Sequence, residues 1–175
     1  SFTKDNLGNW IEDENIKIFD LTYEELQKFD VGSINKLSRY GRRFIHQKKL
    51  ENQKIPSLSE LLDLSSQYND KNLIINLEIK STPIEENLTP RPHEYVKLVI
   101  DEVKKSKISE NIIISSFDWR ILKEIENQSP EISRGYLTYE QAMGIKIKKM
   151  TYDKSPWMNF LSFPNNLELP NIIKN

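Results

Sequence analysis

Three apolar runs separated by helical patterns most constrain the fold of this chain. Residues 73–80, 111–117 and 132–138 have the composition of strands, and residues 93–107 and 118–129 repeat apolar side chains at helical spacing. Strands that alternate with helices form βαβ units, in which the strands are parallel. The sequence therefore predicts an α/β fold built on a parallel sheet.

The first of these strands, LIINLEIK at residues 73–80, has one apolar and one polar face. Successive strand residues point to opposite sides, so Asn76, Glu78 and Lys80 share a face opposite three aliphatic side chains. A barrel packs one strand face under helices and turns the other inward, with its chemistry at the carboxyl ends of the strands. A complete (β/α)₈ barrel takes about 250 residues, so we expect 175 residues to form a partial TIM barrel.

The rest of the chain suggests one domain over residues 1–175 with an irregular beginning. Residues 1–56 are expected to be an insertion or loop region, and residues 57–175 to hold the βα units. Within the first part, Thr22 and Glu25 have capping-box spacing and predict a short helix. Residues 33–54 lack a helical or strand period and are expected to be an exposed loop.

Composition bears on nucleic-acid binding, membrane spans and disulfides. The net charge of −1 gives no reason to expect nucleic acid, and we interpret the basic segment 39–49 as a solvated loop. No apolar run approaches the roughly 18 residues of a membrane span, and the absence of cysteine excludes disulfides. The chain starts at Ser1 without a signal pattern, so we expect it to be a piece of a longer product.

Several motifs, in their order and spacing, resemble those of the bacterial glycerophosphodiester phosphodiesterases. The likeness extends over most of residues 1–140, and it depends on the ordered set because each piece is weak alone. The motifs are LTYEEL (21–26), FDVG (29–32), IPSLSELL (55–62), NLEIK (76–80), ISSFD (114–118) and GYLT (135–138), with TKDNLGNW (3–10), IISSFDWR (113–120) and SPW (155–157) closest to the bacterial branch.

The resemblance implies a fold and a reaction. The fold would be a TIM barrel of the PLC-like phosphodiesterase type, here without its first and last strands. The reaction would be hydrolysis of a glycerophosphodiester to sn-glycerol 3-phosphate and an alcohol, in lipid and glycerol metabolism, with Ca²⁺ or Mg²⁺ as cofactor. A hard cation neutralises the phosphodiester anion and aligns the attacking and leaving oxygens. The compartment stays open between periplasm and cytoplasm, and the periplasm is favoured because relatives in this branch are often exported. The expected partner is a small-molecule substrate, and the oligomeric state stays open.

The resemblance also assigns residues. Glu78 matches a metal-binding carboxylate, Lys80 the lysine near the substrate phosphate, and Phe117 an aromatic near the glycerol moiety. The family's two catalytic histidines have no match, because His46 and His93 fall at other positions. We therefore expect no catalytic residue in this chain, and no hydrolysis by this chain alone.

Three alternatives remain open from the residues. Glu78 and Lys80 could form a structural ion pair, and the chain could be an inactive remnant or a binding-only protein. A different barrel enzyme could use Lys80 as a Schiff-base amine. Ser115 and Ser116 lack the G-x-S-x-G elbow and a placed histidine, so we do not expect a serine nucleophile.

Overall fold

A computed structural model describes residues 3–12, 16–68, 70, 72–138, 150 and 152–162. The chain divides into two compact units, Ser1–Ser57 and Leu58–Asn175. The division falls next to the boundary expected between residues 56 and 57. Whether the two units form one domain stays a prediction, and each unit is described by itself.

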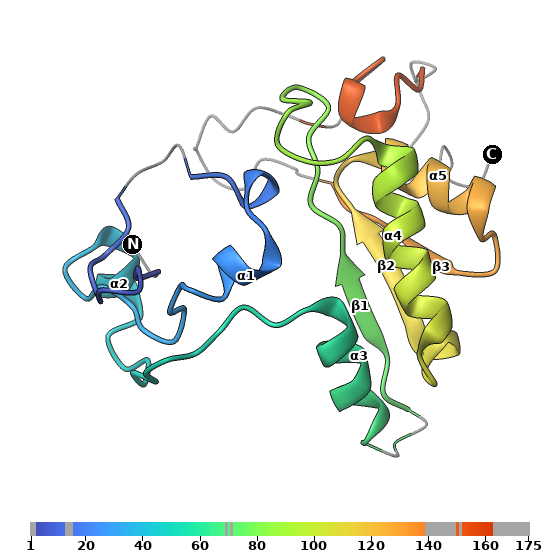
Figure 1. Cartoon of the computed structure of the whole chain (residues 1–175). Helices are drawn as coiled ribbons and strands as arrows, with labels where there is room; N and C mark the ends of the chain where they lie inside the picture. The colour runs from blue at the N-terminus through green and yellow to red at the C-terminus, as the bar shows by residue number, and fades with distance from the viewer. Residues whose placement is uncertain are drawn as a thin grey trace. The chain divides into compact units, whose positions relative to one another are not determined.

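The second unit contains a three-stranded parallel sheet. Its strands are β1 (Ile75–Glu78), β2 (Ile112–Ser116) and β3 (Ser133–Tyr136), in the order β1-β2-β3 (Figure 1). The register aligns Glu78 with Ser115, and Ser115 with Gly135. The predicted α/β class and parallel pairing are confirmed, whereas closure into a barrel is not tested by three strands.

Helices α4 (Pro92–Lys105) and α5 (Trp119–Gln128) connect the strands and cover one face of the sheet (Figure 1). Local sequence explains their ends. Pro92 opens α4 at a position where a missing N–H costs nothing. The Asp118 side chain caps α5 by accepting from the backbone N–H of Arg120 at 3.1 Å. The remaining elements are α3 (Leu58–Ser66), η2 (Ser109–Asn111) and η3 (Pro156–Met158).

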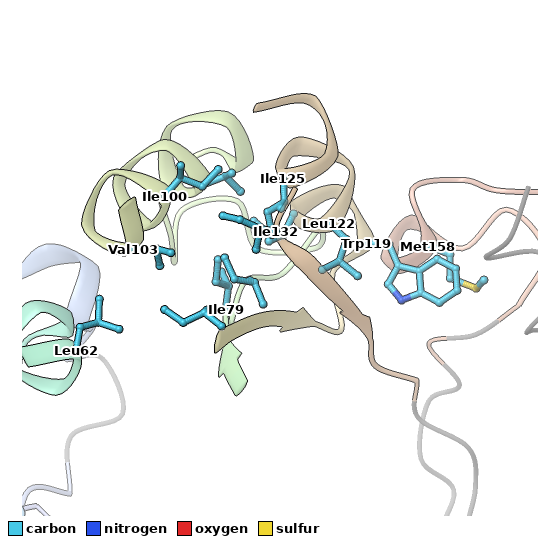
Figure 2. Close-up of a cluster of buried hydrophobic side chains, with 13 residues drawn as sticks. Leu62, Ile79, Ile100, Val103, Trp119, Leu122, Ile125, Ile132 and Met158 are labelled. Carbon is cyan, nitrogen blue, oxygen red and sulfur yellow. The ribbon is translucent and has the colours of Figure 1, made fainter. Parts of the chain in front are cut away.

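The core of this unit lies between the sheet and helices α4 and α5 (Figure 2). Ile79 and Ile114 contribute from the sheet side, and Ile100, Leu122 and Ile125 from the helices. Each such aliphatic side chain contributes about 1.5–3 kcal/mol when it is fully buried. This packing fixes β1 and β2, the strands that carry the candidate site.

Trp119 extends the core toward the end of the described chain. Its indole ring meets Tyr136 edge to face with 4.9 Å between ring centroids, and its Nε1 donates to the Leu137 carbonyl at 3.2 Å. Figure 2 shows Trp119 beside Met158 of η3, and both are buried. Trp119 is thus an anchor of the core of the second unit.

The first unit combines short-range hydrogen bonds with bonds between distant segments, such as the backbone pair of Lys4 and Asp30. The capping box opens α1 (Tyr23–Leu26) as predicted: the Glu25 N–H donates to Thr22 Oγ1 at 3.2 Å, and the Thr22 N–H donates to the Glu25 carboxylate at 2.8 Å. A 3₁₀ turn, η1, spans Ile18–Asp20. The Asp30 carboxylate accepts from the backbone of Gly32 at 2.9 Å, and this bond lowers the pKa of Asp30.

The segment 33–54 differs from the expected exposed loop in two respects, the first being that Ser33 and Ile34 are buried. The second is that it contains a short helix, α2 (Arg39–Arg43), capped by Ser38 Oγ, which accepts from the Gly41 N–H at 2.9 Å. A Cβ at Gly41 would collide with the Asn35 backbone, so this helix depends on a close approach of two backbone segments. Neither periodicity nor composition reports such an approach.

Candidate functional site

The candidate site lies on the face of the sheet opposite α4 and α5. Parallel partners in register point to the same side, so Glu78 of β1, Ser115 of β2 and Gly135 of β3 share this open face. On β1, Asn76 and Glu78 are exposed, while the alternating aliphatic residues turn toward the helices. The alternation predicted from LIINLEIK is therefore present.

Glu78 and Lys80 form an ion pair on this face. Lys80 Nζ lies 2.6 Å from Glu78 Oε1, and the side chains are 78% and 32% exposed, respectively. Exposed pairs of this kind contribute about 0–1 kcal/mol to folding. The pair therefore explains little of the fold's stability, and either partner can turn to a ligand at small cost.

Ser115 is the member of this face that sequence reasoning missed. Its side chain is 1% exposed, and its Oγ has no hydrogen-bond partner among the described residues. On β3, a Cβ at Gly135 would lie 3.0 Å from Ser115 Cβ, closer than side chains normally approach. The sequence held one usable signal, because Ser115 follows the same alternation as Glu78, but only the register places the two at the same level.

A buried polar network fixes the carboxyl ends of β1 and β2. Ser116 Oγ donates to the Ile79 carbonyl at 2.8 Å and accepts from the Asp118 N–H at 3.1 Å. Ser81 Oγ and Arg120 Nη2 each donate to Asp118 Oδ2 at 2.8 Å. These bonds tie the segments that follow both strands, and so set where Lys80 leaves the sheet.

The Asp118 carboxylate at the centre of this network is 0% exposed. Its hydrogen bond with Arg120 raises the pKa of that guanidinium. Buried charges need partners of this quality, because an unpaired one is costly. Asp118 is thus a structural group with its charge already matched.

Phe117 is the remaining predicted site residue, and His93 and His46 are the histidines that we expected not to be catalytic. Phe117 directly follows β2 and is half-buried. His93 lies in the first turn of α4, where its Nδ1 is 3.1 Å from the Glu124 carboxylate of α5, on the helical side of the sheet. His46 is exposed in the first unit. Within the described residues of the second unit, the structure therefore brings no histidine to the face that carries Glu78.

The oxygen donors on this face determine whether it could hold a divalent cation. Hard cations take several oxygen ligands, among which carboxylates are preferred. The described residues contain no group of three or more histidine, cysteine, aspartate or glutamate side chains placed to hold a metal. Glu78 thus fits one ligand position, and the described part of the chain supplies no complete site.

A surface pocket of about 450 Å³ lies near the network, beside the loop that follows β1. It is lined by Arg91 and Arg120, and by polar residues of the loop such as Thr82 and Asn87. Glu78 and Lys80 do not line it. This pocket is not the candidate site, because the Arg120 guanidinium that lines it is already paired with the Asp118 carboxylate.

No helix within the described ranges is long and apolar enough to cross a membrane.

Comparison with known proteins identifies the family of this chain. The model of the glycerophosphoryl diester phosphodiesterase family matches residues 3–162. A glycerophosphodiester phosphodiesterase of Caldanaerobacter subterraneus subsp. tengcongensis is 30% identical over 118 residues, which are 67% of this chain and 40% of that protein. A crystal structure of a candidate glycerophosphoryl diester phosphodiesterase from Silicibacter pomeroyi has a TM-score of 0.70 and 32% identity, over 77% of this chain and 45% of that one.

The chain spans less than half the length of both relatives. The family model nevertheless covers β1, β2, β3 and the helices between them. The resemblance inferred from the ordered motifs is thereby confirmed. The chain belongs to the glycerophosphoryl diester phosphodiesterase family.

Proposed function

We propose that this chain forms part of the active site of a metal-dependent enzyme that hydrolyses glycerophosphodiesters to sn-glycerol 3-phosphate and an alcohol. In this proposal the open face of the sheet is the inner face of a TIM barrel that the chain builds in part. One observation carries it: Glu78 and Lys80 project together from the open face at the carboxyl end of β1, inside the family match.

In this role Glu78 supplies one oxygen ligand to Ca²⁺ or Mg²⁺. The bound cation would neutralise phosphate charge and polarise the phosphoryl oxygens. Lys80, once its ammonium turns from Glu78 to the substrate, binds a phosphate oxygen and offsets charge that develops there. Phe117, at the end of β2, contacts the glycerol moiety. The chain's own task is thus to bind and orient the phosphodiester.

Proton transfer is assigned to groups outside the described residues. A phosphodiester displacement needs an acid and a base within hydrogen-bond reach of the reacting oxygens. His93 is engaged with α5 and His46 belongs to the first unit, so neither is proposed for this role. Activity is accordingly proposed for the complete gene product.

Replacing Glu78 tests the proposal. In the complete gene product, Glu78→Gln should abolish metal-dependent release of glycerol 3-phosphate while the melting temperature in chelator stays near that of the wild type. Glu51→Gln is a matched control, because Glu51 also pairs with a lysine two residues away, Lys49, at 2.5 Å. The control should retain activity.

Two results would overturn the proposal. A Glu78→Gln enzyme with the wild-type rate would remove the metal-ligand role. Borohydride trapping of a carbonyl substrate on Lys80, without metal-dependent phosphodiester cleavage, would favour the Schiff-base alternative.

A further inference from the structure

The Ser115 hydroxyl makes no hydrogen bond that would stabilise the fold. It is buried and has no hydrogen-bond partner within the described ranges. Buried hydroxyls in folded proteins are nearly always hydrogen-bonded, and exceptions call for an explanation. The adjacent Ser116 is also buried, yet its Oγ makes two hydrogen bonds on the other side of the strand. The missing partner thus distinguishes Ser115 from its neighbour on β2, while Ser129 Oγ and Arg134 Nε are the other buried side-chain atoms without a partner among the described residues.

The register leaves one polar neighbour at the level of Ser115. On the β3 side its partner is Gly135, which has no side chain, and on the β1 side its partner is Glu78. Adjacent strands lie about 4.8 Å apart, so a hydroxyl and a carboxylate on register partners can meet. In the structure Lys80 Nζ donates a hydrogen bond to Glu78 Oε1, and Glu78 Oε2 has no hydrogen-bond partner among the described residues.

We propose that Ser115 is a positioning residue whose hydroxyl donates a hydrogen bond to the Glu78 carboxylate when that carboxylate holds a divalent cation. The inference rests on the proposed function. Carboxylates that bind a metal are themselves commonly hydrogen-bonded by a neighbouring group, which orients them. Turning Glu78 from Lys80 to the cation brings a carboxylate oxygen to the level of Ser115 and gives the orphan hydroxyl its acceptor.

The test separates metal affinity from folding. In the complete gene product, Ca²⁺ and Mg²⁺ titrations by calorimetry should show Ser115→Ala to bind the cation about 10- to 100-fold more weakly than the wild type. Its melting temperature in chelator should be unchanged or higher, because the substitution removes a buried hydroxyl that has no partner.

Ser116→Ala is the matched control, one residue away on the same strand. It should lower the melting temperature in chelator, because the Ile79 carbonyl and the Asp118 N–H both lose a partner. Its cation affinity should equal that of the wild type. The two serine variants thus have opposite expected effects on the two measurements.

Two outcomes would overturn the inference. One is a Ser115→Ala protein that binds the cation as tightly as the wild type. The other is a Ser115→Ala protein that loses melting temperature in chelator together with affinity, which would indicate a purely structural hydroxyl. Glu78→Gln in the same series identifies which idea fails. If Glu78→Gln keeps wild-type affinity, the metal site itself is wrong, and if it loses affinity while Ser115→Ala does not, only the role of Ser115 is wrong.

Discussion

The two faces of the sheet are built by the same three strands and differ in almost every physical respect. The face under α4 and α5 is buried and apolar, and it ends in the network around Asp118. The opposite face carries an exposed ion pair and a hydroxyl without a partner. Folding accounts for most residues of the first face, although Arg134 Nε there is buried without a partner among the described residues. It does not account for those of the second, which is why that face is assigned a ligand.

The largest effect is expected where the covered face meets its charged network. Asp118→Ala should destabilise the second unit by about 3–5 kcal/mol, because it leaves Arg120 without its carboxylate and removes the cap of α5. Urea unfolding monitored by circular dichroism measures this. Asp118→Asn keeps a capping oxygen and should cost less. Equal losses for the two variants would mean that the charge of Asp118 contributes nothing.

A direct comparison of the faces uses two neighbouring isoleucines of β2. Ile114 is buried under the helices, whereas Ile113 lies on the open face and is half-buried. Ile114→Ala should cost about 2–5 kcal/mol of unfolding free energy, and Ile113→Ala about half as much. Similar losses in the same urea experiment would show that the open face is packed, and would break the comparison.

A smaller effect on stability is expected on the open face itself. Lys80→Ala should change the unfolding free energy by no more than about 1 kcal/mol and should still depress turnover strongly. Lys97→Ala serves as control, since Lys97 Nζ pairs with the Asp101 carboxylate at 2.6 Å on the exposed side of α4. The control should have the same small effect on stability and unchanged turnover. Wild-type kinetics in Lys80→Ala would remove its role with phosphate.

The smallest effect concerns pH at the contact between α5 and β3. A hydrogen bond from Lys123, with Arg134 nearby, lowers the pKa of Glu126 from 4.5. A lowered folded pKa means that the stabilisation is present above about pH 4.5 and is lost as pH falls through the folded value. The melting temperatures of wild type and Glu126→Gln should thus differ at pH 7 and converge in acid. A constant difference would contradict this.

Local features of the fold could be predicted from the sequence. The βαβ rhythm, the Thr22–Glu25 capping box and the Asp118 cap depend on residues a few positions apart, and all are present. The helix α2 could not be predicted, because Gly41 is required by the backbone at Asn35 and not by a helical pattern.

The candidate site could be predicted only in part for a similar reason. Alternation in β1 places Glu78 and Lys80 together, so one strand suffices to find them. Ser115 depends on the pairing of β1 with β2, two strands separated by the whole of α4. A sequence also does not show that the Ser115 hydroxyl lacks a hydrogen-bond partner.

The hydrogen bonds from Ser81 and Arg120 to a single carboxylate oxygen of Asp118 have a consequence for how such a protein can diversify. They join the segment after β1 to the start of α5, so an insertion next to Ser81 would strain the start of α5 as well. Residues 82–91 lie beyond this joint. Changes there can therefore reshape the pocket lined by Thr82, Arg91 and Arg120 without altering the hydrogen bonds that Ser81 and Arg120 make to Asp118.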